Sequence, residues 1–149
     1  MNIHEYQGKK LFREAGVAVL DGRHCTTVND ALGAYDALGN KVVAVKSQIH
    51  AGGRGKGNLY SPKTRDLVME GGVKIAFSRE DVEKFSRNIY GNILVTKQTG
   101  KEGKLVKNIY VETGCDIEKE YYLAILVDRD RKSVPVSYTH LTLPTNREV

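Results

Sequence analysis

The chain has 149 residues, 40% of them hydrophobic, and a net charge of +5 from 23 Lys and Arg against 18 Asp and Glu. This content is enough to bury one core, divided at most between two small lobes. No stretch approaches the roughly 20 apolar residues that span a bilayer, and the polar start lacks the apolar core of a signal peptide. We therefore expect a cytoplasmic protein without membrane contact. Acidic residues lie between the basic ones throughout, which argues against a nucleic-acid partner.

The two cysteines and four histidines form no metal-binding pattern. Cys25 and Cys115 stand alone, without a C-x-x-C pair, and the sequence contains no H-E-x-x-H. We therefore predict no zinc site and expect each cysteine to be a buried free thiol.

The first thirty-eight residues predict two helices with a short strand between them. Asn2 and Glu5 have the spacing of a capping box, so a helix is expected over Ile3–Ala15, ended by Gly16. Val17–Leu20 is apolar enough to predict a strand. A second helix should begin at Thr27, run through Leu38 and end at Gly39.

The middle of the chain predicts strands around an irregular excursion. Lys41–Ser47 is β-branched and apolar, which is typical of a buried strand. Asn58–Gly72 has no clear period and is interpreted as an excursion or flap. Val73–Phe77 then predicts a further strand, and Ser78 is placed to begin a third helix that ends near Gly91.

The remaining elements predict antiparallel pairing. Asn92–Thr99 and Lys107–Thr113 alternate apolar and polar residues around the turn at Gly100–Gly103, so a β-hairpin is expected. A strand is expected at Glu120–Val127, before the polar turn at Asp128–Lys132. Helices mixed with antiparallel strands indicate an α+β fold.

A glycine-rich loop directly after the predicted strand at Lys41–Ser47 carries the strongest chemical signal. Lys46 near the end of that strand is followed by Ala51–Gly57 (A-G-G-R-G-K-G), with four glycines in six positions. Such a backbone can approach a ligand and direct N–H groups at phosphate oxygens, and Arg54 and Lys56 add positive charge. Neither a Walker A loop nor a Rossmann fingerprint is present. From composition alone, a flexible basic loop without a ligand remains an alternative.

Three blocks of sequence resemble one family. Asn2–Phe12 (N-I-H-E-Y-Q-G-K-K-L-F), Val45–Lys56 (V-K-S-Q-I-H-A-G-G-R-G-K) and Val111–Glu120 resemble the β subunit of succinate–CoA ligase, also called succinyl-CoA synthetase. The resemblance covers most of Met1–Val134. It implies an ATP-grasp fold, in which two α+β lobes hold a nucleotide between them, with the N-terminal lobe complete and the second lobe truncated.

The resemblance implies which residues bind the phosphates of the nucleotide. Lys46 matches the lysine that contacts them, with an exposed lysine at a strand end as the alternative. Gly53, Arg54 and Gly55 match the loop that covers them. His50 lies within the same block, and we assign it no catalytic role.

The resemblance also implies contacts with the nucleoside. Glu112 falls on the strand whose backbone holds the adenine edge, and Cys115 falls where a backbone N–H meets the base. Glu120 matches the acid that accepts hydrogen bonds from the ribose hydroxyls. The alternatives are an ordinary strand carboxylate for Glu112 and a surface salt bridge for Glu120.

The family reaction joins succinate and CoA at the expense of ATP or GTP, through a phosphohistidine on a separate, CoA-binding α subunit. By the resemblance, this chain supplies nucleotide binding, contains no catalytic residue and needs the α subunit as its partner. The Mg²⁺ ligands are expected outside this sequence, so the chain alone should be inactive. Alternatives are another ATP-grasp acyl-CoA ligase, of the malate–CoA ligase or ATP-citrate lyase type, and a non-catalytic nucleotide-binding remnant.

Two regions depart from the family pattern. Asn58–Gly72 is longer than the same connection in the shortest members, which leaves the shape of the excursion open. Pro135–Val149 resembles nothing in the family and shows no continuing pattern. We therefore predict an incomplete nucleotide-binding domain over 1–134, followed by a non-native or disordered tail over 135–149, with an authentic divergent tail as the alternative.

Overall fold

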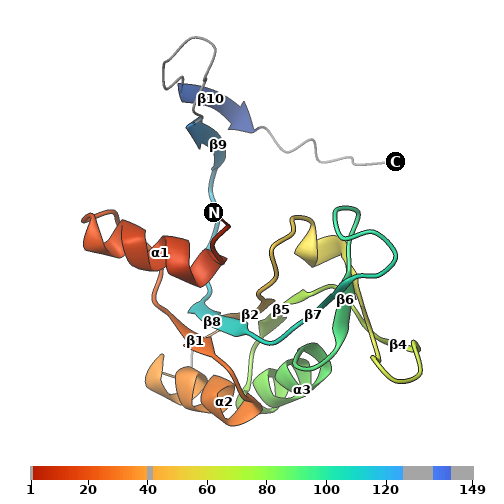
Figure 1. Ribbon diagram of the computed structural model, residues 1–149. Coiled ribbons are helices and arrows are strands. Elements are labelled where there is room, and N and C mark those ends of the chain that lie inside the picture. Colours follow the sequence, from red (N-terminus) through yellow and green to blue (C-terminus); the bar gives the residue numbers. More distant parts are fainter. Residues whose placement is uncertain (1, 40–41, 126–135, 142–149) are drawn as a thin grey trace. The chain divides into compact units, whose positions relative to one another are not determined.

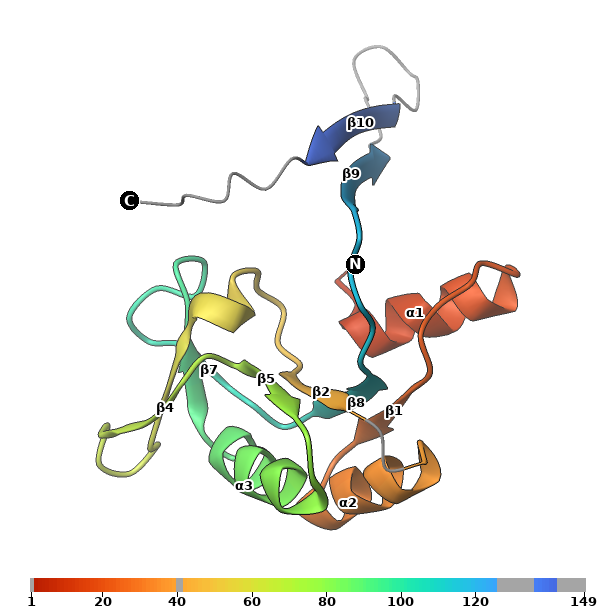
Figure 2. The same cartoon turned by 180° about the vertical axis from the view of Figure 1, so that it is seen from behind.

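The computed structural model describes residues 2–39, 42–125 and 136–141 and divides the chain into two compact units, Met1–Gly114 and Cys115–Val149. Within the described residues, the first unit contains three α-helices and two antiparallel sheets (Figures 1 and 2). The α+β prediction is therefore confirmed.

The first sheet has the strand order β1-β8-β2-β5, with every neighbouring pair antiparallel. These strands are β1 (Gly22–Cys25), β8 (Ile109–Thr113), β2 (Val43–Ser47) and β5 (Val73–Ala76). The predicted strands that end at Ser47 and begin at Val73 are confirmed.

The strand predicted at Val17–Leu20 is wrong. The backbone there completes the end of the preceding helix instead, since the N–H of Val17 donates to Phe12 O at 2.9 Å. Leu20 O accepts from the guanidinium of Arg13 at 3.1 Å. Pairing with β8 begins only at Gly22, which lies opposite Glu112.

The two faces of the first sheet differ in chemistry. Cys25, Val43, Val45, Ile109 and Val111 are buried in the hydrophobic core. Helices α2 (Val28–Ala37) and α3 (Arg79–Ile89) pack against this side of the sheet, whereas α1 (Glu5–Glu14) lies on the other side (Figures 1 and 2). The polar face is therefore the one that α1 covers.

The helix ends confirm two of the three predicted caps. Thr27 Oγ1 accepts from Asp30 N at 3.0 Å, and Ser78 Oγ accepts from Asp81 N at 3.2 Å, as expected for α2 and α3. The capping box at Asn2 and Glu5 is wrong, because α1 begins two residues later than predicted, at Glu5, with His4 as its N-cap.

At the start of α1, the N–H of His4 donates to Gln7 Oε1 at 2.8 Å. Gly16 adopts the expected left-handed conformation after the helix, with φ of 77°. The displaced cap leaves the carboxylate of Glu5 available for long-range contacts.

The second sheet has the order β4-β3-β6-β7. It contains β4 (Leu67–Glu70), β3 (Asn58–Tyr60), β6 (Ile93–Val95) and β7 (Lys104–Leu105). The excursion at Asn58–Gly72 is thus a hairpin of β3 and β4. The sequence did not predict these strands because the segment lacks a regular alternation of apolar and polar residues.

The hairpin predicted between Asn92–Thr99 and Lys107–Thr113 is only half right. The turn at Gly100–Gly103 joins β6 to β7, and the chain then leaves this sheet. β8 lies between β1 and β2 in the first sheet instead. All but the last of its five residues are buried, which suits a central strand covered on both faces.

The second unit contains β9 (Glu120–Ile125) and β10 (Val136–Leu141), which pair antiparallel with Val136 opposite Ile125. The strand that begins at Glu120 is confirmed to Ile125, and the predicted turn at Asp128–Lys132 lies outside the described residues. Val136–Leu141 forms a strand within the tail predicted over 135–149. The alternation V-S-Y-T-H-L is itself typical of a strand. A non-native origin of this tail stays a prediction.

Two glycine substitutions should have opposite effects on stability. A Cβ at buried Gly57 would lie 2.6 Å from Val95 O, so Gly57→Ala should lower the free energy of unfolding by about 1–3 kcal/mol. A Cβ at Gly33, exposed within α2, meets nothing within 4 Å. Gly33→Ala should therefore raise stability by about 0.5–1 kcal/mol. Urea denaturation followed by circular dichroism checks both values, and equal effects would contradict this packing.

Candidate functional site

A buried ion pair occupies the polar face of the first sheet. Ala44 lies opposite Glu112 and Lys46 lies opposite Tyr110, so Lys46 and Glu112 project from the same face of adjacent strands. Lys46 Nζ donates to Glu112 Oε2 at 2.6 Å, and the Glu112 side chain is only 2% exposed. A carboxylate this deeply buried needs a cation beside it, which Lys46 provides.

Helix α1 adds charges of both signs to this pair. Glu5 Oε1 lies 3.0 Å from Lys46 Nζ, and Glu5 Oε2 lies 2.7 Å from Arg54 Nη2. Lys9, one turn after Glu5, donates a hydrogen bond to Glu112 and lies 3.6 Å from Glu5. The five side chains therefore alternate in sign and connect α1, β2, β8 and the glycine-rich loop.

The glycine-rich loop is folded into a short 3₁₀ turn, Arg54–Lys56 (η1), that begins after Gly53. Gly53 has φ of 74°, a left-handed conformation that favours glycine at this point. The loop is held by the guanidinium of Arg54, which donates to Ser47 O at 2.6 Å, and by Gly72 N, which donates to Arg54 O at 2.8 Å. The glycines on either side of Arg54 allow the backbone of this turn to come close to a ligand.

A cavity of about 460 Å³ lies where this loop faces the start of α1. Its volume is within the range of small-molecule sites. The residues that line it are Asn2, Ile3, Glu5, Ile49, His50, Ala51, Arg54 and Gln98. With the guanidinium of Arg54 in its wall, the cavity is chemically suited to phosphate oxygens once Glu5 is drawn aside.

The network fixes the charge states of its members. Burial alone would raise the pKa of Glu5, but the hydrogen bond from Arg54 and the charge of Lys46 hold that pKa at about 2. Burial alone would lower the pKa of Lys46, but the hydrogen bond to Glu112 and the charge of Glu5 raise that pKa above its usual value. Both groups are therefore charged across the physiological pH range.

The structure brings together most of the site residues predicted from sequence. Lys46, Arg54 and Glu112 belong to one network, with Gly53 and Gly55 in the adjoining loop. Lys46 is not an exposed lysine, because only 19% of its side chain is accessible. Their contacts with a nucleotide stay predictions.

Cys115 and Glu120 lie in the second unit, so their assigned roles toward the base and the ribose also stay predictions. The side chain of Cys115 is exposed, which makes the expectation of a buried thiol there wrong. Cys25 is buried as expected. Its burial and the nearby Asp30 raise the pKa of its thiol to about 12, so it is unreactive.

Sequence reasoning missed Glu5 and Lys9 as members of the site. Glu5 was assigned only to a helix cap. The available signal was the opposite charges of Glu5 and Lys9, four residues apart on the predicted helix. A glycine-rich loop with an excess of cations needs acidic partners of this kind.

The sequence comparison settles the family. A family model for the ATP-grasp domain matches residues 2–139, which extends past Val134, where the resemblance was expected to end. The chain belongs to the ATP-grasp family. This membership confirms the predicted fold class.

The ATP-grasp chain is also similar to several bacterial proteins named succinate–CoA ligase [ADP-forming] subunit beta. It is 50% identical over 129 residues to the protein of Staphylococcus saprophyticus. The aligned region covers 87% of this chain and 30% of that protein. It is 50% identical over 136 residues to the Campylobacter fetus protein, which covers 91% of this chain and 32% of that protein. The chain thus spans about a third of the length of these relatives.

Two further observations concern the described residues alone. They contain no group of three or more His, Cys, Asp or Glu side chains placed to hold a metal ion. None of the helices in the described ranges combines the length and apolar character that crossing a bilayer requires.

The ion pairs of Glu5 predict acid-sensitive stability. A pKa lowered from 4.5 to about 2 stabilises the folded chain fully above pH 5, and this stabilisation is lost as the pH falls toward 2. The shift corresponds to roughly 3 kcal/mol, which partial exposure of Glu5 reduces to about 2 kcal/mol. Urea unfolding of the wild type and Glu5→Gln should differ by that amount at pH 7 and converge at pH 2. A difference that does not depend on pH would contradict the assigned ion pairs.

Proposed function

We propose that this chain is the nucleotide-binding part of the β subunit of an ADP-forming succinate–CoA ligase. The observation that carries the proposal is that Lys46 and the loop residue Arg54 bind the same carboxylate, that of Glu5. They do so in an ATP-grasp chain that is similar to β subunits of this ligase. Such a subunit would bind the nucleotide, and succinate and CoA would meet on the assembled enzyme.

The phosphate subsite is the position that Glu5 now occupies. Its two carboxylate oxygens lie 3.0 Å from Lys46 Nζ and 2.7 Å from Arg54 Nη2, so one anion already bridges the two cations. A phosphoryl group offers the same bridging oxygens with more negative charge, and Arg can bind it through two parallel hydrogen bonds. The nucleotide phosphates would therefore take the place of Glu5, which has Lys9 as a remaining partner.

The nucleoside subsite would begin where β8 leaves the sheet. The side chain of Glu112 is committed to Lys46 and Lys9, so only its backbone is available for a base. Hydrogen bonding at the end of the strand continues to Gly114, whose N–H donates to Val42 O at 2.7 Å. Cys115 is the next residue, and its N–H is the first backbone donor after this hydrogen bond. We therefore favour the N–H of Cys115 as a donor to the base. Glu120 remains the proposed acceptor for the ribose hydroxyls.

The chemical contribution of this chain would be positioning and charge stabilisation. Phosphoryl transfer depends mainly on holding the reacting groups in line and on neutralising the charge of the transferring group. Lys46 and Arg54 would supply fixed positive charge at the phosphates of ATP or GTP. A bound Mg²⁺ would neutralise further phosphate charge, and its ligands would come from outside this chain.

The phosphorylated histidine would belong to the α subunit, which we propose as the partner. Similarity to succinate–CoA ligase β subunits favours succinate over malate or citrate as the acid substrate.

Two substitutions that break the same ion pair should change nucleotide affinity in opposite directions. Arg54→Met removes a phosphate ligand and should weaken ADP binding about tenfold or more. Glu5→Gln removes the competing carboxylate and should strengthen ADP binding. Isothermal titration calorimetry measures both constants, with Arg87→Met, an exposed arginine on α3, as the control. If both substitutions weakened binding equally, the pair would be structural and the proposed phosphate subsite would be wrong.

The isolated chain should have no ligase activity. Metal ligands and the phosphohistidine are both expected on other parts of the enzyme, so a bound nucleotide would have no acceptor for its phosphoryl group. The purified chain is assayed for ATP hydrolysis that depends on both succinate and CoA. Turnover that requires both substrates and disappears in Arg54→Met would contradict this expectation.

A further inference from the structure

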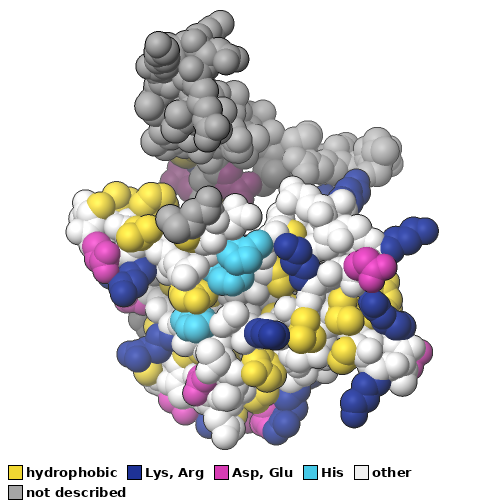
Figure 3. All heavy atoms as spheres, viewed as in Figure 1, with side chains coloured by type: hydrophobic (Ala, Val, Ile, Leu, Met, Phe, Trp, Pro, Cys, Tyr) yellow, Lys and Arg dark blue, Asp and Glu magenta, His cyan; other side chains and the backbone are white. Residues whose placement is uncertain are grey.

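A smaller cavity adjoins the loop site at Ile49 and His50. Its volume is about 180 Å³, and it shares only Ile49 and His50 with the larger cavity. On the face shown in Figure 3, histidine side chains lie beside lysine or arginine side chains. The lining residues are His4, Gln48, Ile49, His50, Lys104, Leu105, Lys107 and Asn108.

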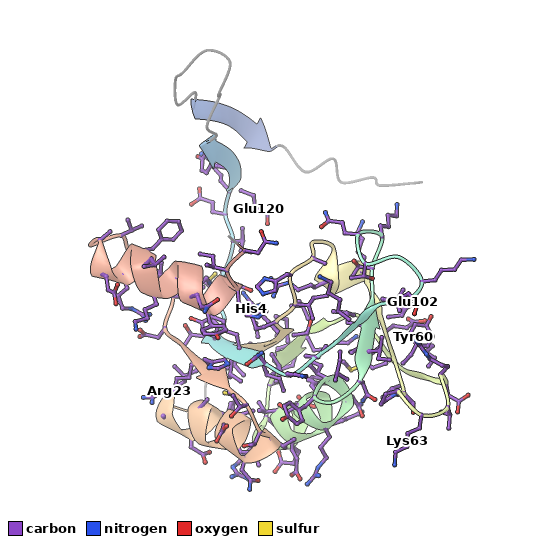
Figure 4. The ribbon with its side chains drawn as sticks, viewed as in Figure 1. His4, Arg23, Tyr60, Lys63, Glu102 and Glu120 are labelled. Atoms are coloured by element: carbon purple, nitrogen blue, oxygen red, sulfur yellow. The ribbon has the colours of Figure 1, made fainter. Side chains whose placement is uncertain are left out.

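Stacked rings form one wall of this cavity. His4 stacks on His50 with ring centroids 3.9 Å apart and planes at 14°. On the other side of the stack, Tyr6 lies against His24 with centroids also 3.9 Å apart. The ring of His24 in turn hydrogen-bonds Asn108 Oδ1 at 2.7 Å. The imidazoles are therefore held in place by α1, β1 and the loop after β2, with His4 at the beginning of α1 (Figure 4).

The cavity combines positive charge with an absence of acids. Lys104 Nζ donates to His50 O at 3.3 Å, which holds this ammonium at the rim. Lys107 lines the same cavity. Neither lysine is ion-paired with a carboxylate among the described residues, and none of the described lining residues is acidic. An anion would therefore find donors here without a competing carboxylate, unlike the loop site.

We propose that this cavity is a binding site for a small tetrahedral oxyanion of the phosphate or sulfate class, held by Lys104, Lys107 and the His4–His50 pair. The volume is below the range of nucleotide-sized sites, so a free inorganic anion fits better than a nucleotide. Two ammonium groups and a protonated imidazole can provide charge-assisted hydrogen bonds to the oxygens of such a ligand. The site is separate from the proposed phosphate subsite at Arg54.

Proton uptake by His4 should strengthen this binding. Burial, and after it the positive charges of His50, His24 and Arg54, lower the pKa of His4. The Nδ1 atom of His4 is buried without a hydrogen-bond partner among the described residues. A bound anion offsets the repulsion and favours the protonated ring. The charged and titratable groups around the pair are Glu5 and Tyr6 of α1, His24 of β1, Arg54 of η1, and Lys104 and Lys107.

Of these surrounding groups, Glu5 is the carboxylate, and it is already paired with Lys46 and Arg54. It therefore contributes little negative charge to the histidine pair. Protonation of His4 as the pH falls should add positive charge that the incoming anion compensates.

Sulfate titration of the full chain tests the site, because sulfate keeps the same charge across the pH range used. The histidine ring signals are followed by NMR at constant ionic strength, set with chloride. We expect saturable shifts of His4 and His50, and affinity several-fold higher at pH 6 than at pH 8. The double variant Lys104→Gln with Lys107→Gln should bind at least about tenfold more weakly.

The matched control is Lys63→Gln with Lys84→Gln, which removes the same charge from the β3–β4 turn and from α3. It should leave sulfate affinity unchanged. An equal loss of affinity in both double variants would show that sulfate binding depends only on net charge, and would overturn the proposal. Saturating ADP should also leave the sulfate shifts intact. Displacement of sulfate by ADP would instead assign the cavity to the nucleotide phosphates and overturn a separate site.

Discussion

The arrangement of the first unit depends on one buried negative charge, the carboxylate of Glu112. Its side chain is 2% exposed, so the sheet can contain it only if cations are brought to it. Lys46 approaches from the neighbouring strand and Lys9 from α1. Removing either cation should cost more than a surface ion pair, because the charge left behind has little access to water.

The same constraint explains how α1 is attached. All ten residues of this helix are described and none is fully buried, so apolar burial contributes little to its position. Instead, Lys9 binds Glu112, while Glu5 binds both Lys46 and Arg54. A helix held mainly by ion pairs can release one of them to a ligand with stronger charge. This would allow a bound phosphate to take over the ion pairs of Glu5 while Lys9 still holds α1 to the sheet.

Local patterns predicted much of this fold because local interactions determine those parts. Thr27 and Ser78 cap their helices through neighbouring amides, and the apolar run before the glycine-rich loop forms a central strand. The failures involve distant partners. The strand at Lys107–Thr113 was assigned to the nearest strand, but it pairs with β1 and β2, because a strand buried on both faces needs two neighbours. Likewise, Lys46 and Arg54 were found from the loop pattern, whereas Glu5 joins them across 41 and 49 residues.

A crystal structure of the chain with bound ADP would test most directly whether phosphate replaces Glu5 between Lys46 and Arg54. The account predicts a phosphate oxygen within hydrogen-bonding distance of both cations, the Glu5 carboxylate displaced from them, and the Lys46–Glu112 pair retained. Electron density for ADP elsewhere, with Glu5 still bridging Lys46 and Arg54, would contradict it.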